Sequence, residues 1–284
     1  MPLTVFEIAC VVVVALTIAS ASRTRDLAGL LRDYAALAVA AWIGEDTSIA
    51  FYRFYAYAPG WHLHVHRVPI LVPLIWPLVV LSARDVVSKL WPGSGWQRSL
   101  AVGALVIFDA SLVEVVAVRA GLWSWAEAGH LGVPLVGIAG WGFFAAGADL
   151  ALSRGTPFAA ILTGPLATHA LVLVTWWGLF RWTLRGDLGT SALVALVVLA
   201  ALAFVVARRR RAASFAIPFD LAMPRMIAAS LFVVLLLTTA PLDGPLWLHS
   251  ACVAVPYLAA TSFTGLRRTR SPEGPHGSRS QSPR

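Results

Sequence analysis

Nine long apolar segments dominate the sequence and limit what it can fold into. Each is close to the roughly 20 residues that an α-helix needs to cross the hydrocarbon core of a bilayer. They lie at about 3–20, 27–45, 68–84, 99–118, 133–152, 158–181, 190–207, 225–241 and 245–263. Only 13% of the 284 residues are charged, well below the roughly 25% of a soluble domain. The sequence therefore predicts an all-α, polytopic bundle of about eight to nine transmembrane helices over residues 1–265.

Arginines between the segments predict an orientation, because membrane proteins carry Lys and Arg mainly in cytoplasmic loops. Placing the run Arg208–Arg211 in the cytoplasm puts the N-terminus outside and the C-terminus inside. The tail over 266–284 is rich in Ser, Pro, Arg and Gly, which predicts a disordered, basic cytoplasmic segment able to contact lipid headgroups. We therefore attribute the net charge of +8 to topology and membrane lipids, and expect no nucleic-acid partner.

The stretch Trp42–Trp76 holds the densest group of polar and aromatic residues. Two acids, Glu45 and Asp46, stand where the second apolar segment should end. A carboxyl kept protonated by apolar surroundings can act as a general acid, which makes both residues catalytic candidates. The alternative is a pair of solvated acids at the membrane interface.

Two further acids, Asp109 and Glu114, lie inside the fourth segment. Charged groups within spans are costly and usually face a bundle interior or a cavity, so both are catalytic candidates. Their five-residue spacing places them about 140° apart on a helix. One or both could instead pair with an arginine such as Arg119. The predicted topology brings the loops over 46–67 and 119–132 to the same side of the membrane, where the two stretches can converge.

Three histidines alternate in the first stretch, at His62, His64 and His66. On a strand all three would point to one side, whereas on a helix only His62 and His66 would share a face. Histidines and carboxylates together are typical metal ligands. The spacings of membrane di-iron enzymes, such as HxxHH, do not occur here. We therefore expect no metal and no other cofactor, and keep these histidines as the alternative.

Aromatic residues accompany the acids in both stretches. At span ends, tryptophan and tyrosine often form only an interfacial belt. A cluster facing a cavity would instead suit a polyene, or stabilise a developing cation through the ring faces. The candidates for substrate contact are Tyr55, Tyr57, Trp61, Trp76, Trp123, Trp125 and Trp141.

Several enzyme signatures do not occur in the sequence. It has no Walker motif, no GxSxG, no GxGxxG opening a helix and no DDxxD-like pair. The missing Asp-rich pair argues against a prenyltransferase that holds a diphosphate through magnesium.

Two blocks, strongest over residues 44–150, resemble the polytopic carotenoid biosynthesis family that includes bacterial and archaeal carotenoid hydratases. That family shows an acid before a PFGxYxY-like aromatic segment, then a GVP-like turn and an apolar span with Trp. In GEDTSIAFYRFYAYAPGWHLHVHRVPILVPLIWPLVVLSARD the counterparts are Glu45, the run Phe51–Tyr57, the segment Arg67–Pro69 and Trp76. The family's PFG is replaced here by AFY.

The second block, FDASLVEVVAVRAGLWSWAEAGHLGVPLVGIAGW, resembles the family's membrane Asp, acid-Pro pair, WxW and GVPxxNxxGW. The matching residues are Asp109, Glu114, Trp123, Trp125, Gly132, Val133, Pro134, Gly140 and Trp141. The sequence departs from the pattern at Val115, where the family has proline, and at Gly137, where it has asparagine.

The resemblance implies a hydratase, a lyase that adds water to a terminal double bond of a carotenoid or related isoprenoid. An acid would protonate the alkene to give a tertiary carbocation, and a positioned water would capture it. Glu45 or Asp46, with Asp109 or Glu114, would supply acid and base. The lipid-soluble substrate would enter laterally from a bacterial-type cytoplasmic membrane.

The sequence is compatible with three other functions. An isoprenoid end-group cyclase would start with the same protonation, and an internal alkene would replace water. A transporter or ion-handling protein would use the acids and histidines for protons or ions, although the inverted repeats typical of one are not evident. A metal-dependent membrane enzyme would depend on His62, His64 and His66. The oligomeric state does not follow from the sequence.

Overall fold

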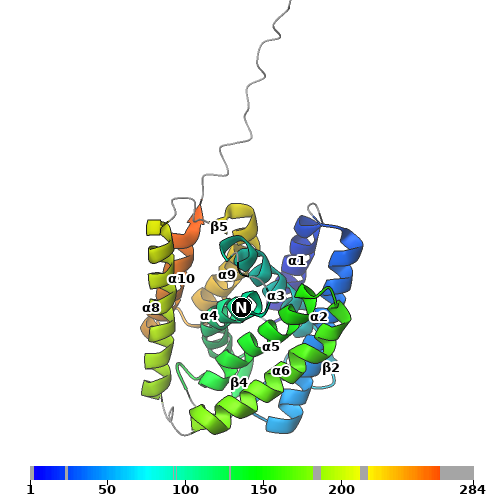
Figure 1. Cartoon of the computed structure of the whole chain (residues 1–284). Helices are drawn as coiled ribbons and strands as arrows, with labels where there is room; N and C mark the ends of the chain where they lie inside the picture. The colour runs from blue at the N-terminus through cyan, green and yellow to red at the C-terminus, as the bar shows by residue number, and fades with distance from the viewer. Residues whose placement is uncertain are drawn as a thin grey trace, which may run out of the picture.

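Long helices form almost the whole of the computed structural model, which describes residues 3–22, 25–91, 93, 95–127, 129–181, 187–211 and 217–262 (Figure 1). Two shorter turns, the 3-10 helix η1 (Pro157–Ala159) and the π-helix η2 (Trp176–Phe180), flank the sixth helix. The α-helices are α1 (Leu3–Ala21), α2 (Leu27–Tyr52), α3 (Leu71–Leu90), α4 (Trp96–Arg119), α5 (Leu135–Ser153), α6 (Ala160–Thr175), α8 (Asp187–Arg211), α9 (Phe219–Thr239) and α10 (Gly244–Ala260).

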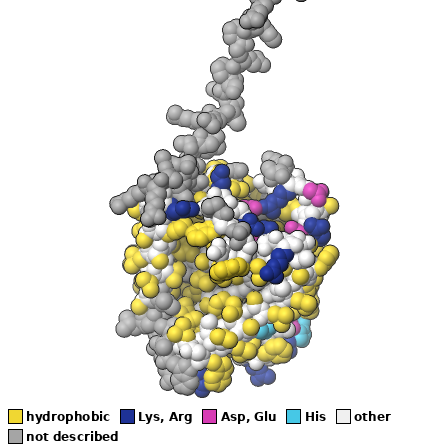
Figure 2. Space-filling model, in the orientation of Figure 1, with side chains coloured by type: hydrophobic (Ala, Val, Ile, Leu, Met, Phe, Trp, Pro, Cys, Tyr) yellow, Lys and Arg dark blue, Asp and Glu magenta, His cyan; other side chains and the backbone are white. Residues whose placement is uncertain are grey.

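The predicted all-α membrane fold is confirmed. Within the described residues, seven helical segments are long and apolar enough to cross a membrane. α8 has a shorter apolar part, Val194–Val206, and α10 has 17 residues. The surface is also that of a membrane protein. Hydrophobic side chains cover most of the flank in Figure 2, and charged side chains gather mainly toward its upper end. The predicted disordered tail over 266–284 lies outside the described residues.

The second helix is longer than predicted. α2 continues past 45 and ends at Tyr52, where Arg53 takes a left-handed conformation (φ 53°) and its N–H bonds to Ile49 O. Glu45 and Asp46 consequently lie within the helix and not at its end. Helical residues differ in direction by about 100° from one to the next, so these neighbouring acids point to different surroundings.

α4 has a central position, since it contacts α3, α5, α8, α9 and α10. Its approach to α5 depends on two glycines: a Cβ on Gly103 would lie 2.7 Å from Gly142 O, and one on Gly142 would lie 2.7 Å from Gly103 O. Small residues allow this close packing between membrane helices. The fold therefore carries Asp109 and Glu114, both on α4, into the middle of the bundle.

Polar side chains between helices are largely paired. Asp149 on α5 is 0% exposed; it accepts a hydrogen bond from Ser99 at 2.7 Å and lies 3.7 Å from Arg84. His169 on α6 bonds to Thr47 at 2.7 Å and to Tyr52 at 2.8 Å, both on α2. These two bonds connect α6 to α2.

Three short strand pairs occur near the helix ends. β1 (Tyr55–Tyr57) pairs antiparallel with β4 (Trp123–Trp125), so the two loops predicted to share one side do meet. β2 (His64–Val65) and β3 (Val68–Pro69) form a tight hairpin in which His66 has a φ of 61°. β5 (Ile217–Pro218) runs parallel to β6 (Thr261–Ser262).

Candidate functional site

A largely apolar cavity of about 690 Å³ lies inside the bundle, between side chains from α1 to α6, α9 and α10. Its size is within the range of about 300–1,000 Å³ that small-molecule sites occupy. Four charged residues line it among those described: Glu45, Asp109, Glu114 and Arg225. All seven aromatic residues predicted to contact substrate line it as well. The cavity thus unites the two stretches that the sequence marks as functional.

The β1–β4 ribbon supplies four of these aromatic groups. Side chains alternate along a strand, so Tyr55 and Tyr57 lie on one face of β1, and Trp123 and Trp125 lie on one face of β4. The register places Tyr55 opposite Trp125 and Tyr57 opposite Trp123, with ring centroids 4.8 Å and 6.0 Å apart. The YxY and WxW motifs therefore form one aromatic wall of the cavity.

Glu45 projects from α2 and accepts hydrogen bonds from three aromatic side chains. The hydroxyls of Tyr55 and Tyr57 both donate to Oε2, the second at 2.8 Å. The indole N–H of Trp76, on α3, donates to Oε1 at 2.8 Å. Burial, and after it the charge of Glu45, raise the pKa of Tyr55 and of Tyr57 well above that of a free tyrosine. Both hydroxyls therefore keep their protons.

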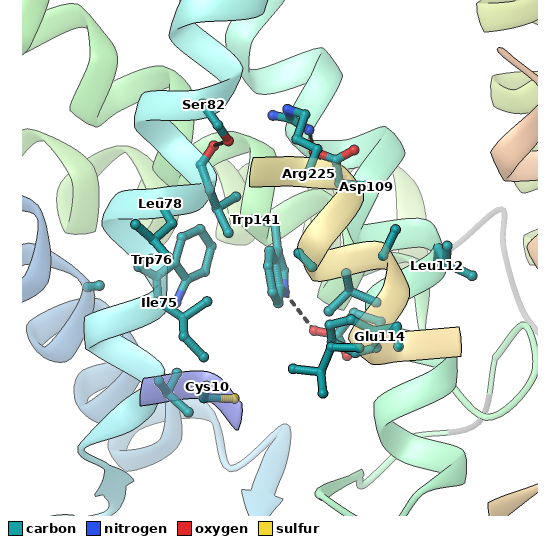
Figure 3. A pocket seen from close by; sticks show the side chains of 18 of the residues that line it. Cys10, Ile75, Trp76, Leu78, Ser82, Asp109, Leu112, Glu114, Trp141 and Arg225 are labelled. Carbon is teal, nitrogen blue, oxygen red and sulfur yellow. Dashed lines mark hydrogen bonds and ion pairs between the residues drawn. The ribbon is translucent and has the colours of Figure 1, made fainter. Parts of the chain in front are cut away.

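Glu114 projects from α4 and is held by three indoles. Trp123 and Trp125 donate to Oε2 at 2.8 Å and 2.9 Å, and Trp141 of α5 donates to Oε1 at 2.6 Å. Figure 3 shows the last of these bonds at the wall of the cavity. Glu114 is only 3% exposed. These three N–H donors supply hydrogen bonds to both carboxyl oxygens, but they are uncharged and do not neutralise a carboxylate.

The two carboxyl groups share one aromatic chamber. The rings of Trp76 and Trp141, which donate to Glu45 and Glu114 respectively, lie with centroids 4.5 Å apart. In the part of the chain that the structure describes, neither Glu45 nor Glu114 forms an ion pair. Glu114, which is buried, and Glu45, which is partly buried, therefore face a common apolar space and accept hydrogen bonds only from neutral donors.

Gly137 gives Trp125 the room it occupies. A Cβ at Gly137 would lie 2.5 Å from Cζ2 of Trp125, closer than two such atoms can come. At Gly140, one turn further along α5, the nearest atom to an added Cβ would be a methyl of Val172 at 3.8 Å. The absence of a side chain at Gly137 thus allows the indole of Trp125 to reach Glu114.

Asp46 and Trp61 have other roles. Asp46 points away from the cavity to the β2–β3 hairpin, where it lies 2.8 Å from His66 and 3.4 Å from Arg67. Trp61 lines the cavity, but its N–H is bonded to Leu122 O at 3.0 Å. Of the two neighbouring acids proposed as catalytic, the structure places only Glu45 at the site.

The three histidines point in different directions. His62 pairs with Glu7 of α1, His66 pairs with Asp46, and His64 is exposed on β2. Among the described residues, no three potential metal ligands lie close enough together to hold an ion. Another histidine contact lies outside the cavity, where His130 bonds to Ser191 at 2.8 Å and to His249 at 3.3 Å.

Asp109 lies in an environment unlike that of Glu114. Arg225 of α9 and Tyr257 of α10 both donate to its carboxylate, and Arg225 also donates to Tyr257 at 3.0 Å. Figure 3 shows Asp109 and Arg225 together, above Glu114. Arg119, the partner considered from the sequence, instead pairs with Asp243 at 2.7 Å.

The sequence analysis did not identify Arg225 and Tyr257, because both lie outside residues 44–150, where the candidate site residues were found. The available signal was an arginine at the start of a predicted apolar segment. α9 begins earlier, at Phe219, which places Arg225 inside the helix.

Comparison with known proteins found no matching family model, no matching curated protein and no matching solved structure. Function is therefore inferred from the site's own residues.

Proposed function

We propose that the protein is a membrane enzyme that protonates a terminal double bond of a carotenoid or related isoprenoid and adds water to it. One observation carries the proposal: Glu45 and Glu114 share an apolar, aromatic chamber in which each accepts three neutral hydrogen bonds. The resemblance of the two sequence blocks to carotenoid hydratases supports the same reaction.

The partners of the two acids suit them to different roles. An indole N–H can only donate, so the three tryptophans around Glu114 suit a carboxylate that acts as the base. A tyrosine hydroxyl can donate or accept, so Tyr55 and Tyr57 can adjust to a protonated Glu45. We assign Glu45 as the general acid and Glu114 as the general base.

The reaction then balances without an added reagent. Glu45 gives its proton to the less substituted alkene carbon, and the π electrons form the new C–H bond and leave a tertiary cation. Water forms the C–O bond to that cation while Glu114 takes its proton. Exchange of one proton with solvent water returns Glu45 to its acid form and Glu114 to its carboxylate. Electron-rich faces of Tyr55 and Trp125 would stabilise the cation before capture.

Expression in a lycopene-producing host tests the proposal. We expect a more polar pigment whose mass has increased by one water, and we expect Glu45→Gln to abolish it. Asp46→Asn is the matched control, because this neighbouring acid does not line the cavity. An isomer of unchanged mass would identify a cyclase, and an unchanged pigment profile with normal membrane expression would refute both reactions.

We further propose that the N-terminus lies outside a bacterial-type cytoplasmic membrane and the C-terminus inside, on the basis of the arginine distribution. The β1–β4 ribbon would then face the non-cytoplasmic side. A fluorescent protein that matures only in the cytoplasm, fused to the C-terminus, should fluoresce. A dark, full-length fusion would reverse the orientation.

A further inference from the structure

Part of the guanidinium of Arg225 has no hydrogen-bond acceptor among the described residues. Its Nη1 atom donates to Asp109 and Tyr257. Its Nε and Nη2 atoms are buried and meet no acceptor in the described part of the chain. The side chain is 12% exposed and lines the cavity. Leaving buried N–H groups without acceptors is costly, so an unused guanidinium edge at a cavity wall indicates a ligand atom.

The charges around Arg225 favour a neutral acceptor. Asp109 already balances its positive charge, and Asp85 on the neighbouring α3 is paired with Arg25. A carboxylate or phosphate bound to Arg225 would therefore lie beside Asp109 and add an uncompensated negative charge in an apolar place. A hydroxyl, ether or carbonyl oxygen would accept the same hydrogen bonds without that cost.

The walls at this end of the cavity are otherwise suited to hydrocarbon. Val86, Ile217 and Ala222 line the cavity and belong to one buried apolar cluster. Ser82 of α3 adds a hydroxyl, and Figure 3 shows it on the other side of the upper cavity from Arg225. A mainly apolar ligand that carries a neutral oxygen suits these walls.

We propose that Arg225 binds a neutral oxygen atom of the substrate, so that the enzyme acts on an oxygenated isoprenoid in preference to a pure hydrocarbon. The inference deepens the proposed function and depends on it only for the isoprenoid class. Asp109 and Glu114 are five residues apart on α4, which is about 7.5 Å along the helix axis. The oxygen therefore binds at a second point of the cavity, separate from the carboxyls that act on the alkene.

Binding of matched polyenes to the purified protein in lipid nanodiscs tests this assignment. The ligands are retinol, its hydrocarbon counterpart without the hydroxyl, and retinoic acid, each detected by quenching of tryptophan fluorescence. We expect retinol to bind about tenfold more tightly than the hydrocarbon, as one hydrogen bond to a charged donor predicts. Retinoic acid should bind more weakly than retinol at a pH where it is ionised.

The double variant Arg225→Met/Asp109→Asn removes the donor without leaving a buried charge. Its retinol preference should fall to within about twofold, since the hydrogen bond is lost. Comparing the ratio of the two affinities between variants cancels the different partitioning of the two ligands into lipid. Arg119→Met is the matched control: it breaks another Arg–Asp pair on α4, at a residue that does not line the cavity, and should keep the wild-type preference.

Equal binding of retinol and the hydrocarbon by the wild-type protein would overturn the assignment, as would a double variant that keeps the preference. If Arg225 had a purely structural role and only joined α9 to α4 and α10, the wild-type protein would bind retinol and the hydrocarbon equally. Preferential retinol binding by a protein that hydrates neither lycopene nor a hydroxylated carotenoid would support the oxygen subsite and refute the hydratase. Hydration of the pigment by a protein that binds retinol and the hydrocarbon equally would support the hydratase and refute the oxygen subsite.

Discussion

Glu114 and Asp109 stand on the same helix, line the same cavity and have opposite surroundings. Three indoles donate to Glu114, and no cation pairs with it among the described residues. Asp109 pairs with Arg225 and accepts a further bond from Tyr257. Removing either partner of this ion pair would leave the other charge buried and unpaired, so the pair is suited to holding helices together. Glu114 can gain or lose a proton without breaking an ion pair, which makes it the better candidate for chemistry.

The same contrast separates Glu45 from the buried Asp149. Asp149 lies near Arg84 and bonds to Ser99, between α5, α3 and α4. Glu45 bonds to Tyr55, Tyr57 and Trp76. Asp109 and Asp149, which lie near an arginine, thus connect helices, whereas Glu45 and Glu114 accept only from neutral aromatic donors and face the chamber.

Replacing Glu114 should have the largest effect on the reaction. Glu114→Gln removes the proposed base, and we expect the rate of hydration to fall by about 10²–10⁴-fold, as for loss of a general acid or base. Product formation in membranes, normalised to the amount of folded protein, measures the effect. A variant that retains more than half of the rate would show that Glu114 is not the base.

Breaking the Asp109–Arg225 ion pair should lower the stability of the fold more than it changes the reaction. Asp109→Asn leaves the buried Arg225 without its counter-ion, which should destabilise the fold by about 3–5 kcal/mol. Thermal unfolding in detergent should show this loss, and Arg225→Met in the same chain should recover much of it. A stable Asp109→Asn variant that has lost hydration completely would instead make Asp109 a catalytic acid.

Filling the space at Gly137 should separate the indole from its carboxyl. Gly137→Ala forces Trp125 to move, and overpacking of this kind costs about 1–3 kcal/mol. We expect a lower melting temperature, a shifted tryptophan emission and slower hydration. Gly140→Ala, where an added Cβ makes only ordinary contacts, should change none of these. Equal effects at both positions would show that general packing of α5 is responsible.

Removing Asp46 should have the smallest effect. Its partners His66 and Arg67 are more than 40% exposed in their side chains, and exposed ion pairs contribute only about 0–1 kcal/mol. Asp46→Asn should therefore change the hydration rate and the melting temperature little. A loss as large as that for Glu45→Gln would mean that both acids serve the reaction.

Much of the fold follows from the sequence alone. Apolar segments of membrane length must leave water, so the all-α membrane fold and the rough positions of most helices could be predicted from them. The alternation in YxY and WxW likewise predicts side chains that share one face of a strand. Asp109 and Glu114 were predicted as candidates because charged groups within apolar segments are costly, and Glu45 and Asp46 because they stand at the expected end of such a segment.

Only the tertiary structure decided what each acid does. Asp109 meets Arg225, which is 116 residues away, and Glu114 meets Trp141, 27 residues away. Such pairs depend on which helices pack together and how each is rotated, and hydrophobic patterning does not specify either. The rotation of α2 likewise sends Glu45 into the cavity and its neighbour Asp46 to a hairpin. The sequence determined which acids stand within or beside apolar segments, and packing determined which of them gained a counter-ion.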